Sequence, residues 1–365
     1  SWFCIAGILL AFVAFGQEDS PHSTLRLIFR HGDRTPTETY PTDPHRDSRV
    51  WPDGWGQLTK EGKMQMYNLG QFLRTRYNGY INDLYSSDEM IMQSSANDRC
   101  LMSAQVVLAG LYPPVGYQVW NDELHWQPIP VHSTPRNLDQ LIVMKKPCPR
   151  NEQELEKAYQ SSRIQEINQK NAQLYEYLTT HTGKEIQNIT AVEFLYNTLE
   201  IEDNHGLKLP EWTTSVYPEK MKKLAAMSLA IFTSSDIQKR LIGGPLVGEI
   251  TRNMENKRTG SLKPDRKMVL YSAHDLTIVN VWRALGFTDL IKPEYGAALL
   301  FELHVTRSGT DHEVKMLYRN NTSTKNLFIL NMPNCAQPCH LDMFLKLTQP
   351  VIPIDWDQEC HNTLA

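Results

Sequence analysis

Three stretches of the chain share one order of features: an apolar run with the composition of a strand, a short polar turn, and an amphipathic helix. Strands that alternate with helices are typical of a parallel or mixed α/β sheet. Ligands bind such sheets where the carboxyl ends of the strands meet helix N-termini. The first predicted strand covers 25–29, and its helix begins after the N-cap Thr59. The second strand covers 90–95 with a helix over 100–109, and the third covers 267–273 with a helix over 276–285.

The turn after the first run carries the motif Arg30-His31-Gly32-Asp33-Arg34-Thr35-Pro36. Histidine is one of the side chains that form covalent intermediates, and arginine grips phosphate with paired hydrogen bonds. A chance match to this pattern is on the order of 10⁻⁴ for a chain of this length. The motif therefore predicts phosphoryl transfer, with His31 as the acceptor and Arg30 and Arg34 as phosphate ligands.

The other two turns carry side chains that suit the same chemistry. Asp98 is expected to cap the helix after the second run, which places Arg99 in its first turn. The third turn supplies His274 and Asp275. Because the carboxyl ends of parallel strands meet at one edge, we expect six residues to gather there: Arg30, His31, Arg34, Arg99, His274 and Asp275.

The polar region over 135–225 predicts a different kind of structure, a mostly helical insertion that roofs the strand ends. A capping box that begins at Thr190 predicts one helix start, and Pro218 predicts another. The residues Gly243-Gly244-Pro245 predict a turn that ends a helix. Further strands are expected at 298–305 and 314–318. The predicted fold is α/β, with a central mixed, largely parallel sheet flanked by helices. Its expected divisions are a catalytic domain over 17–134 and 226–365, and a helical cap domain over 135–225.

Composition narrows the location and partners of the protein. The net charge of −4 across 365 residues argues against nucleic acid or an anionic membrane as a partner. Residues 2–16 are uncharged and almost wholly apolar, as in the h-region of a signal peptide, so residues 1–16 are predicted to be an N-terminally incomplete signal peptide. No second apolar run of spanning length occurs. We expect secretion without a membrane anchor, or delivery to the lysosomal lumen.

The cysteines agree with the secretory route, where disulfides form. Cys335 and Cys339 are close enough in sequence to pair locally. Cys148 and Cys360 are then candidates for a long-range bridge, and Cys100 is expected to be a free, buried thiol. No cluster has the spacing of a zinc site, so no metal is expected. Three sequons predict glycosylation sites, although a sequon alone is a weak signal: Asn188, Asn320 and Asn321.

The motif at Arg30, the Asp98-Arg99 pair and Tyr271-Ser272-Ala273-His274-Asp275 resemble the histidine acid phosphatase family, and the resemblance extends from about Leu25 to Cys360. Within the family the chain is most similar to animal prostatic and lysosomal-type enzymes and to insect secreted or venom acid phosphatases. The resemblance implies an α/β domain with a helical insertion, no cofactor and a possible homodimer. The relatives usually have three disulfides, of which the resemblance supports Cys148–Cys360 and Cys335–Cys339 here.

The resemblance also implies a role for each site residue. His31 is the nucleophile, Asp275 the proton donor, and the phosphate ligands are Arg30, Arg34, Arg99 and His274. The expected reaction is metal-independent hydrolysis of small phosphomonoesters or phosphoproteins through a phosphohistidine. Its optimum is expected to be acidic, because both His274 and Asp275 are expected to work in protonated form.

Three alternatives remain open at this point. A phytase-like enzyme for inositol polyphosphates shares the chemistry, but it needs a basic pocket, and no extra Lys or Arg cluster stands beside the motifs. A phosphoglycerate mutase-type enzyme is less consistent with a signal peptide. A secreted, non-catalytic binding protein on a phosphatase scaffold would not need all six site residues intact.

Overall fold

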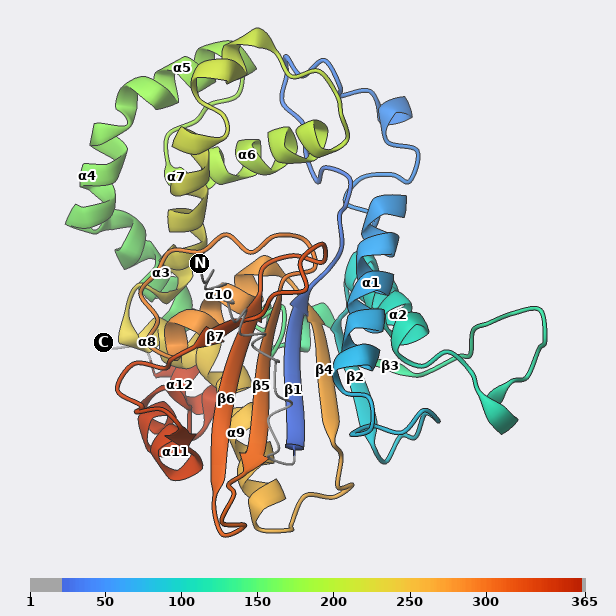
Figure 1. Cartoon of the computed structure of the whole chain (residues 1–365). Helices are drawn as coiled ribbons and strands as arrows, with labels where there is room; N and C mark the ends of the chain where they lie inside the picture. Colours follow the sequence, from blue (N-terminus) through green and yellow to red (C-terminus); the bar gives the residue numbers. More distant parts are fainter. Residues whose placement is uncertain (1–21, 363–365) are drawn as a thin grey trace, which may run out of the picture.

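The computed structural model describes residues 22–362, so the predicted signal peptide lies outside the described residues. An eight-stranded mixed sheet forms its centre, in the order β3-β2-β4-β1-β5-β6-β7, with β8 paired to β6 (Figure 1). The mixed α/β sheet predicted from the sequence is confirmed. The strands are β1 (His22–Arg30), β2 (Met90–Ser95), β3 (Val131–Thr134), β4 (Met268–Ala273), β5 (Ala298–Val305), β6 (His312–Arg319), β7 (Phe328–Leu330) and β8 (Cys339–His340).

The sheet has a parallel half and an antiparallel half. Strands β3, β2, β4 and β1 pair in parallel, whereas β5 to β8 join through antiparallel pairings. Arg30 of β1 lies opposite Ala273 of β4, and Ser94 of β2 lies opposite Ser272. This register brings the turns that follow β1, β2 and β4 to the same level at one edge.

Alternating side chains on β1 pack against two different helical layers, as the period of a strand requires. Leu25, Leu27 and Phe29 are buried against α1 (Lys60–Arg76) and α2 (Asp98–Leu111). Ile28 belongs to the cluster on the other face. Burying each such side chain contributes about 1.5–3 kcal/mol to folding. The helices on the Ile28 face are α9 (Gly244–Arg258), α10 (Asp275–Ala284) and α11 (Leu341–Thr348).

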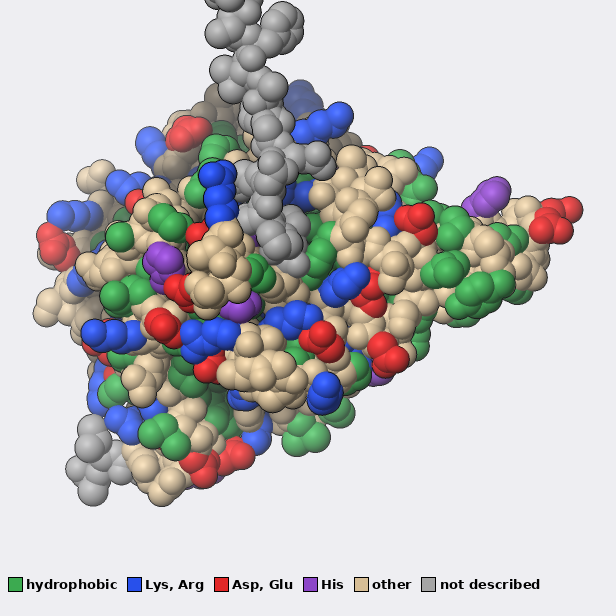
Figure 2. Space-filling model, turned by 60° about the horizontal axis from the view of Figure 1, so that its bottom comes forward, with side chains coloured by type: hydrophobic (Ala, Val, Ile, Leu, Met, Phe, Trp, Pro, Cys, Tyr) green, Lys and Arg blue, Asp and Glu red, His purple; other side chains and the backbone are tan. Residues whose placement is uncertain are grey.

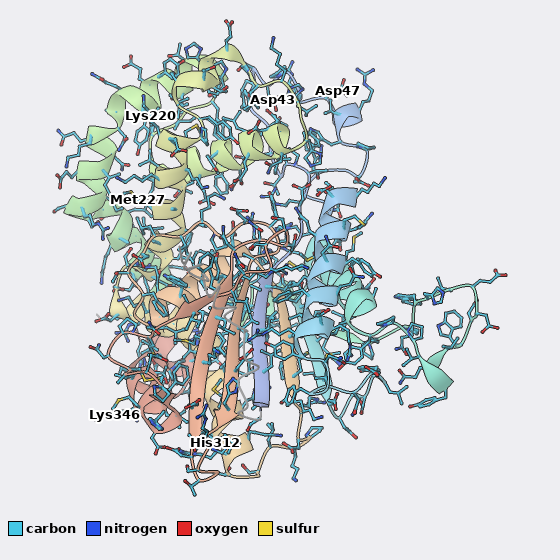
Figure 3. The ribbon with its side chains drawn as sticks, viewed as in Figure 1. Asp43, Asp47, Lys220, Met227, His312 and Lys346 are labelled. Carbon is cyan, nitrogen blue, oxygen red and sulfur yellow. A yellow bond between two sulfur atoms is a disulfide. The ribbon has the colours of Figure 1, made fainter. Side chains whose placement is uncertain are left out.

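A group of helices with its own apolar core lies beyond the carboxyl edge of the sheet (Figure 1). This core runs from Ala158 to Ile231 and also takes in Tyr40, which comes from the loop between β1 and α1. Met227 on α7 packs against it, and Asp43 marks the loop that lies beside it (Figure 3). The helices are α3 (Pro149–Gln160), α4 (Ser162–Lys170), α5 (Ala172–Thr182), α6 (Ile189–Asn204) and α7 (Glu219–Ala230).

The predicted helix starts are right at two positions and wrong at two. Thr59 caps α1 by accepting from the Gly62 amide, and α7 begins directly after Pro218. The cap of α2 is Asn97, so Asp98 is already helical. The cap of α6 is Asn188, whose side chain accepts from the Ala191 amide, and the Thr190 hydroxyl instead lies 2.8 Å from that of Tyr159.

The turn predicted at Gly243-Gly244-Pro245 is wrong. Residues 239–243 form a π-helical segment that continues directly into α9. The two glycines are explained by close packing: a Cβ atom on Gly243 would stand 2.4 Å from the carbonyl oxygen of Asn280 on α10. Glycine thus allows two helices to approach here, whereas the sequence alone favours its role as a helix terminator.

Two disulfides fasten the chain, and they join the pairs expected from the sequence. Cys148 at the start of α3 bonds to Cys360 on α12 (Trp356–His361), and Cys335 bonds to Cys339. Cys100 is free and buried. Among the described residues no helix is long and apolar enough to cross a membrane.

Candidate functional site

The turns after β1, β2 and β4 bring together the side chains that the sequence predicted for one site. The His31 amide donates to the carbonyl of Ala273 at 3.0 Å, which fixes the first turn against the third. The His31 and His274 rings lie 5.6 Å apart between centroids, edge to face. Gly32 permits a tight turn here, since a Cβ atom would lie 2.4 Å from the backbone oxygen of Gly62 in α1.

His31 is held in one orientation and one tautomer. Its Nδ1 lies 2.8 Å from the carbonyl oxygen of Gly32, which can only accept a hydrogen bond, so Nδ1 carries the proton. The Nε2 atom therefore bears the lone pair, and the Nε of Arg99 donates to it at 3.2 Å. A neutral imidazole with a directed Nε2 lone pair is a competent nucleophile.

Electrostatics keep this imidazole neutral. Burial, followed by the positive charges of Arg99 and Arg30, holds the pKa of His31 well below its ordinary value. His31 is 2% exposed. A histidine in this setting stays unprotonated in acidic solution, where an exposed histidine would be charged.

The guanidinium of Arg30 is enclosed by a segment that the sequence did not point to. Its Nη1 donates to the carbonyl of Pro293 at 2.6 Å, and its Cζ lies 4.0 Å from the centre of the Tyr295 ring. The Nη2 atom forms an ion pair with Asp275 at 3.3 Å. The Nε atom of Arg30 is buried and has no hydrogen-bond partner among the residues described.

Arg34, which is buried, and Arg99, which is partly buried, add two more cations to this group. Burial lowers the pKa of Arg99, and the neighbouring charge of Arg34 lowers it further. Arg34 is 7% exposed, and within residues 22–362 its Nε has no hydrogen-bond partner. Like charges that are buried close together are stable only with a counter-ion, so the geometry favours a bound anion.

His274 and Asp275 begin α10, where His274 is the N-cap. The Nε2 of His274 lies 3.0 Å from the Ser95 hydroxyl, and the thiol of Cys100 is 3.6 Å away. Burial and the charge of Arg99 lower the pKa of His274 to about 3. The nearby arginines disfavour a further positive charge on His274, so its protonation while it holds phosphate stays a prediction that depends on the opposing charge of the phosphate.

The surroundings of Asp275 favour its ionised form. Burial acts to raise its pKa, but the charges of Arg30 and Lys292 outweigh burial and hold the pKa below its ordinary value. The amide of Leu276 also donates to the carboxylate at 2.8 Å. An anion that competes with Asp275 for Arg30 would raise the pKa of Asp275 again.

The sequence analysis missed several residues around this centre. Tyr295 and Lys292 lie just before β5, which is antiparallel to β1, and the Arg30 amide donates to the Ala297 carbonyl at 2.9 Å. Tyr295 and Lys292 lie near Arg30 only because β5 pairs with β1 in the sheet. Ser95 was within reach of prediction, because it is the last residue of β2 and thus lies at the same edge.

A second hydrogen-bonded group lies behind the motif. The carboxylate of Asp33 accepts from the Thr59 hydroxyl at 2.6 Å and lies 2.7 Å from Nε2 of His205. The hydrogen bond with Asp33 raises the pKa of His205. This group ties the motif to the first turn of α1 and to the end of α6.

Two pockets reach the arginines. The larger has a volume of about 650 Å³, lies between α1, α6 and α7, and has Arg30 and Tyr295 in its lining. The smaller, about 350 Å³, is lined by Arg99 with Trp55 and Gly56. Within the described part of the chain, no group of three or more His, Cys, Asp or Glu residues is placed to hold a metal ion.

The sequons lie in different settings. The Oδ1 of Asn188 accepts from the Ala191 amide. Asn320 and Asn321 both donate to the carboxylate of Glu294 at the larger pocket, at 2.8 and 3.0 Å. Their glycosylation stays a prediction.

Comparison with known proteins agrees with this geometry. Residues 24–319 match the profile described as "Histidine phosphatase superfamily (branch 2)". The chain is 40% identical over 340 residues to lysosomal acid phosphatase of Homo sapiens, covering 92% of this chain and 79% of that protein. Prostatic acid phosphatase of Rattus norvegicus is 39% identical over 342 residues, covering 92% of this chain and 88% of the relative.

Solved structures share the fold at much lower identity. A phytase of Hafnia alvei in complex with tartrate superimposes with a TM-score of 0.73 at 18% identity, covering 93% of this chain and 98% of that one. A multiple inositol polyphosphate phosphatase of Bifidobacterium longum gives a TM-score of 0.60 at 12% identity, covering 94% and 95%. The family profile and the two acid phosphatases together decide the assignment: this chain belongs to branch 2 of the histidine phosphatase superfamily.

Proposed function

We propose that the protein is an acid phosphatase that hydrolyses phosphomonoesters through a phosphohistidine on His31. The observation that carries this proposal is the directed Nε2 lone pair of a buried, neutral His31 that faces Arg99. The identity of 37–40% to lysosomal and prostatic acid phosphatases supports the same activity. The phytase alternative has weaker support, because its relatives here are 12–18% identical and share only the fold.

In the first step, the phosphate dianion of the substrate binds among Arg30, Arg34 and Arg99. The arginines neutralise oxygens that carry charge through the transition state. The Nε2 of His31 attacks phosphorus in line, so a P–N bond forms as the ester P–O bond breaks. The positive charge that develops on the ring is stabilised by the Nδ1–H···O=C bond to Gly32.

Asp275 supplies the proton for the leaving alcohol. Phosphate next to Arg30 competes with the Asp275 carboxylate for the guanidinium, which raises the pKa of Asp275. The protonated acid then donates to the departing oxygen. In the second step, the resulting carboxylate accepts a proton from water as that water attacks phosphorus, the P–N bond breaks, and inorganic phosphate is released.

The setting of the site supports further proposals. We propose that helices α3–α7 act as the cap domain over the strand ends, since they have their own core. The protein is proposed to be secreted or delivered to the lysosomal lumen, as the names of its relatives suggest. Its substrates are proposed to be small phosphomonoesters or phosphoproteins.

A homodimer is also proposed, through an arm formed by residues 113–130. This arm projects from the sheet, and hydrophobic side chains gather on it (Figures 1 and 2). Tyr117 is 81% exposed and Trp120 is 57% exposed. Contiguous exposed apolar surface of this kind marks interaction sites.

The phosphohistidine is testable by trapping. Mixing the enzyme with p-nitrophenyl phosphate, followed by an alkaline quench and peptide mass spectrometry, should find phosphate on His31. His31→Ala should lower kcat by roughly 10⁴-fold or more, because the covalent route is lost. The matched control is His361→Ala, which removes an exposed histidine on α12. Phosphate on another residue, or none during turnover, contradicts the mechanism.

Asp275→Asn should separate substrates by leaving group. An alkyl phosphate needs a proton donor, so its kcat should fall by about 10²–10⁴-fold. An aryl phosphate leaves as a stabilised phenolate and should lose much less. Steady-state kinetics on glycerol phosphate and p-nitrophenyl phosphate give the comparison. An equal loss on both substrates rejects Asp275 as the acid.

The pH profile follows from the pKa shifts. His31 must be neutral to attack, and its pKa is lowered, so kcat/KM should hold as pH falls well below the ordinary histidine value. Asp275 must carry a proton in the complex, so kcat should fall as pH rises through its pKa there. Arg99→Met removes a charge that lowers the pKa of His31, and should move the acid limb to higher pH. An optimum at pH 8 or above would exclude this scheme.

Dimer formation is testable by sedimentation equilibrium. The wild-type protein should sediment at twice the monomer mass, and Trp120→Lys on the arm should shift it toward monomer because a charge cannot be buried there without a partner. Ile354→Lys, at a site that is 95% exposed outside the arm, is the control. A wild-type protein that stays monomeric at micromolar concentration argues against this interface.

A further inference from the structure

The larger pocket is built from polar and charged walls that meet above Arg30. Its lining comes from the first turns of α1, the end of α6, Lys222 on α7, and two loops at 294–295 and 321–323. Arg30 and Tyr295 stand at the point where the pocket meets the proposed phosphate site. A leaving group attached to a phosphate on Arg30 can therefore extend into this space.

The floor of the pocket holds polar groups that lack protein partners. Tyr295 is 6% exposed, and among the described residues its hydroxyl has no hydrogen-bond partner. The buried Nε of Arg30 likewise has no hydrogen-bond partner among the described residues. Buried polar groups in proteins are normally paired, so these two point to a polar ligand at the junction of pocket and phosphate site.

The walls carry more carboxylates than cations. Glu61, Glu200 and Glu294 line the pocket. The basic residues of the lining are Arg30, Lys222 and His205, and His205 is paired with Asp33. Glu200 lies 3.7 Å from the ammonium of Lys292, and Glu294 accepts from two asparagines. Glu61 is exposed, and within residues 22–362 no hydrogen bond or ion pair involves its side chain.

We propose that this pocket selects phosphomonoesters whose alcohol carries a positive charge, an inference that rests on the proposed phosphatase activity. Complementary charge favours such a group, and it disfavours substrates with several phosphates. The polar lining also suits a hydrophilic leaving group better than an apolar one. Two sources share this chemistry: aminoalkyl phosphates and phosphoserine peptides with a nearby lysine.

A pair of substrates of equal size tests the proposal. In 4-aminobutyl phosphate an ammonium group stands where pentyl phosphate has a methyl group, so the two differ mainly in charge. We expect kcat/KM to be about tenfold higher for the amine at low salt, and the preference to shrink as salt is raised. A phosphoserine peptide with lysine, compared with its norleucine analogue, distinguishes the peptide source from the small-molecule one. Inositol hexakisphosphate should be the poorest substrate.

Two substitutions locate the preference. Glu61→Gln and Glu294→Gln should each lower the amine-to-pentyl ratio of kcat/KM by about threefold, because each removes one carboxylate from the wall. Glu176→Gln, an exposed position on α5 outside the pocket, changes the net charge equally and should leave the ratio as in the wild type. Circular dichroism confirms that each variant is folded.

The outcomes separate this inference from the proposed function. A ratio near one, with p-nitrophenyl phosphate still hydrolysed, overturns charge selection but leaves the phosphatase activity in place. A high ratio that neither pocket substitution lowers overturns the assignment to this pocket. Failure to hydrolyse every ester, with no phosphate trapped on His31, overturns the proposed function and this inference together.

Discussion

The structure depends on the balance of charge around Arg30, which is 2% exposed at the end of the first strand. A buried guanidinium is costly unless it is paired and hydrogen-bonded. The protein meets this cost with the Pro293 carbonyl, the Tyr295 ring and the Asp275 carboxylate. Arg34 donates to the Thr35 carbonyl and Arg99 donates to His31, but within residues 22–362 neither forms an ion pair with a carboxylate, so the centre carries an excess of positive charge that suits a phosphate.

The same excess of charge sets the protonation states that the proposed reaction needs. Burial and this charge together favour the neutral imidazole of His31, and the charges of Arg30 and Lys292 favour the ionised form of Asp275. The proposed proton donor Asp275 therefore does not need a high pKa before the substrate binds. In the proposed mechanism, the phosphate of the substrate changes the electrostatic setting of Asp275 and so prepares the proton donor.

Local sequence signals predicted the centre of the site well, and long-range contacts explain what they missed. Arg30, His31, Arg99, His274 and Asp275 each lie within a few residues of a strand end, so the strand pattern was enough to bring them together. Lys292 and Tyr295 reach Arg30 only through the antiparallel pairing of β5 with β1, about 260 residues along the chain, and no local pattern encodes that pairing.

Errors at the helix ends have a similar cause. The Thr190 hydroxyl is engaged by Tyr159, so a tertiary partner takes up a polar group that the capping rule considers, and α2 begins one residue earlier than expected, with Asn97 as its cap. At Gly243 the same small side chain serves either a turn or a close helix contact. Sequence pattern does not distinguish these two uses.

The arrangement of the two cores has a consequence for how such an enzyme can diversify. All six site residues and the segment that encloses Arg30 come from the ends of sheet strands and the turns beside them, whereas α6 and α7 supply one wall of the substrate pocket. Substitutions on those helices can retune which alcohols are accepted while the bond-breaking machinery is left as it is. The wall on α6 and α7 can thus vary independently of the strand ends, whereas Glu294 shares its segment with Tyr295 beside Arg30.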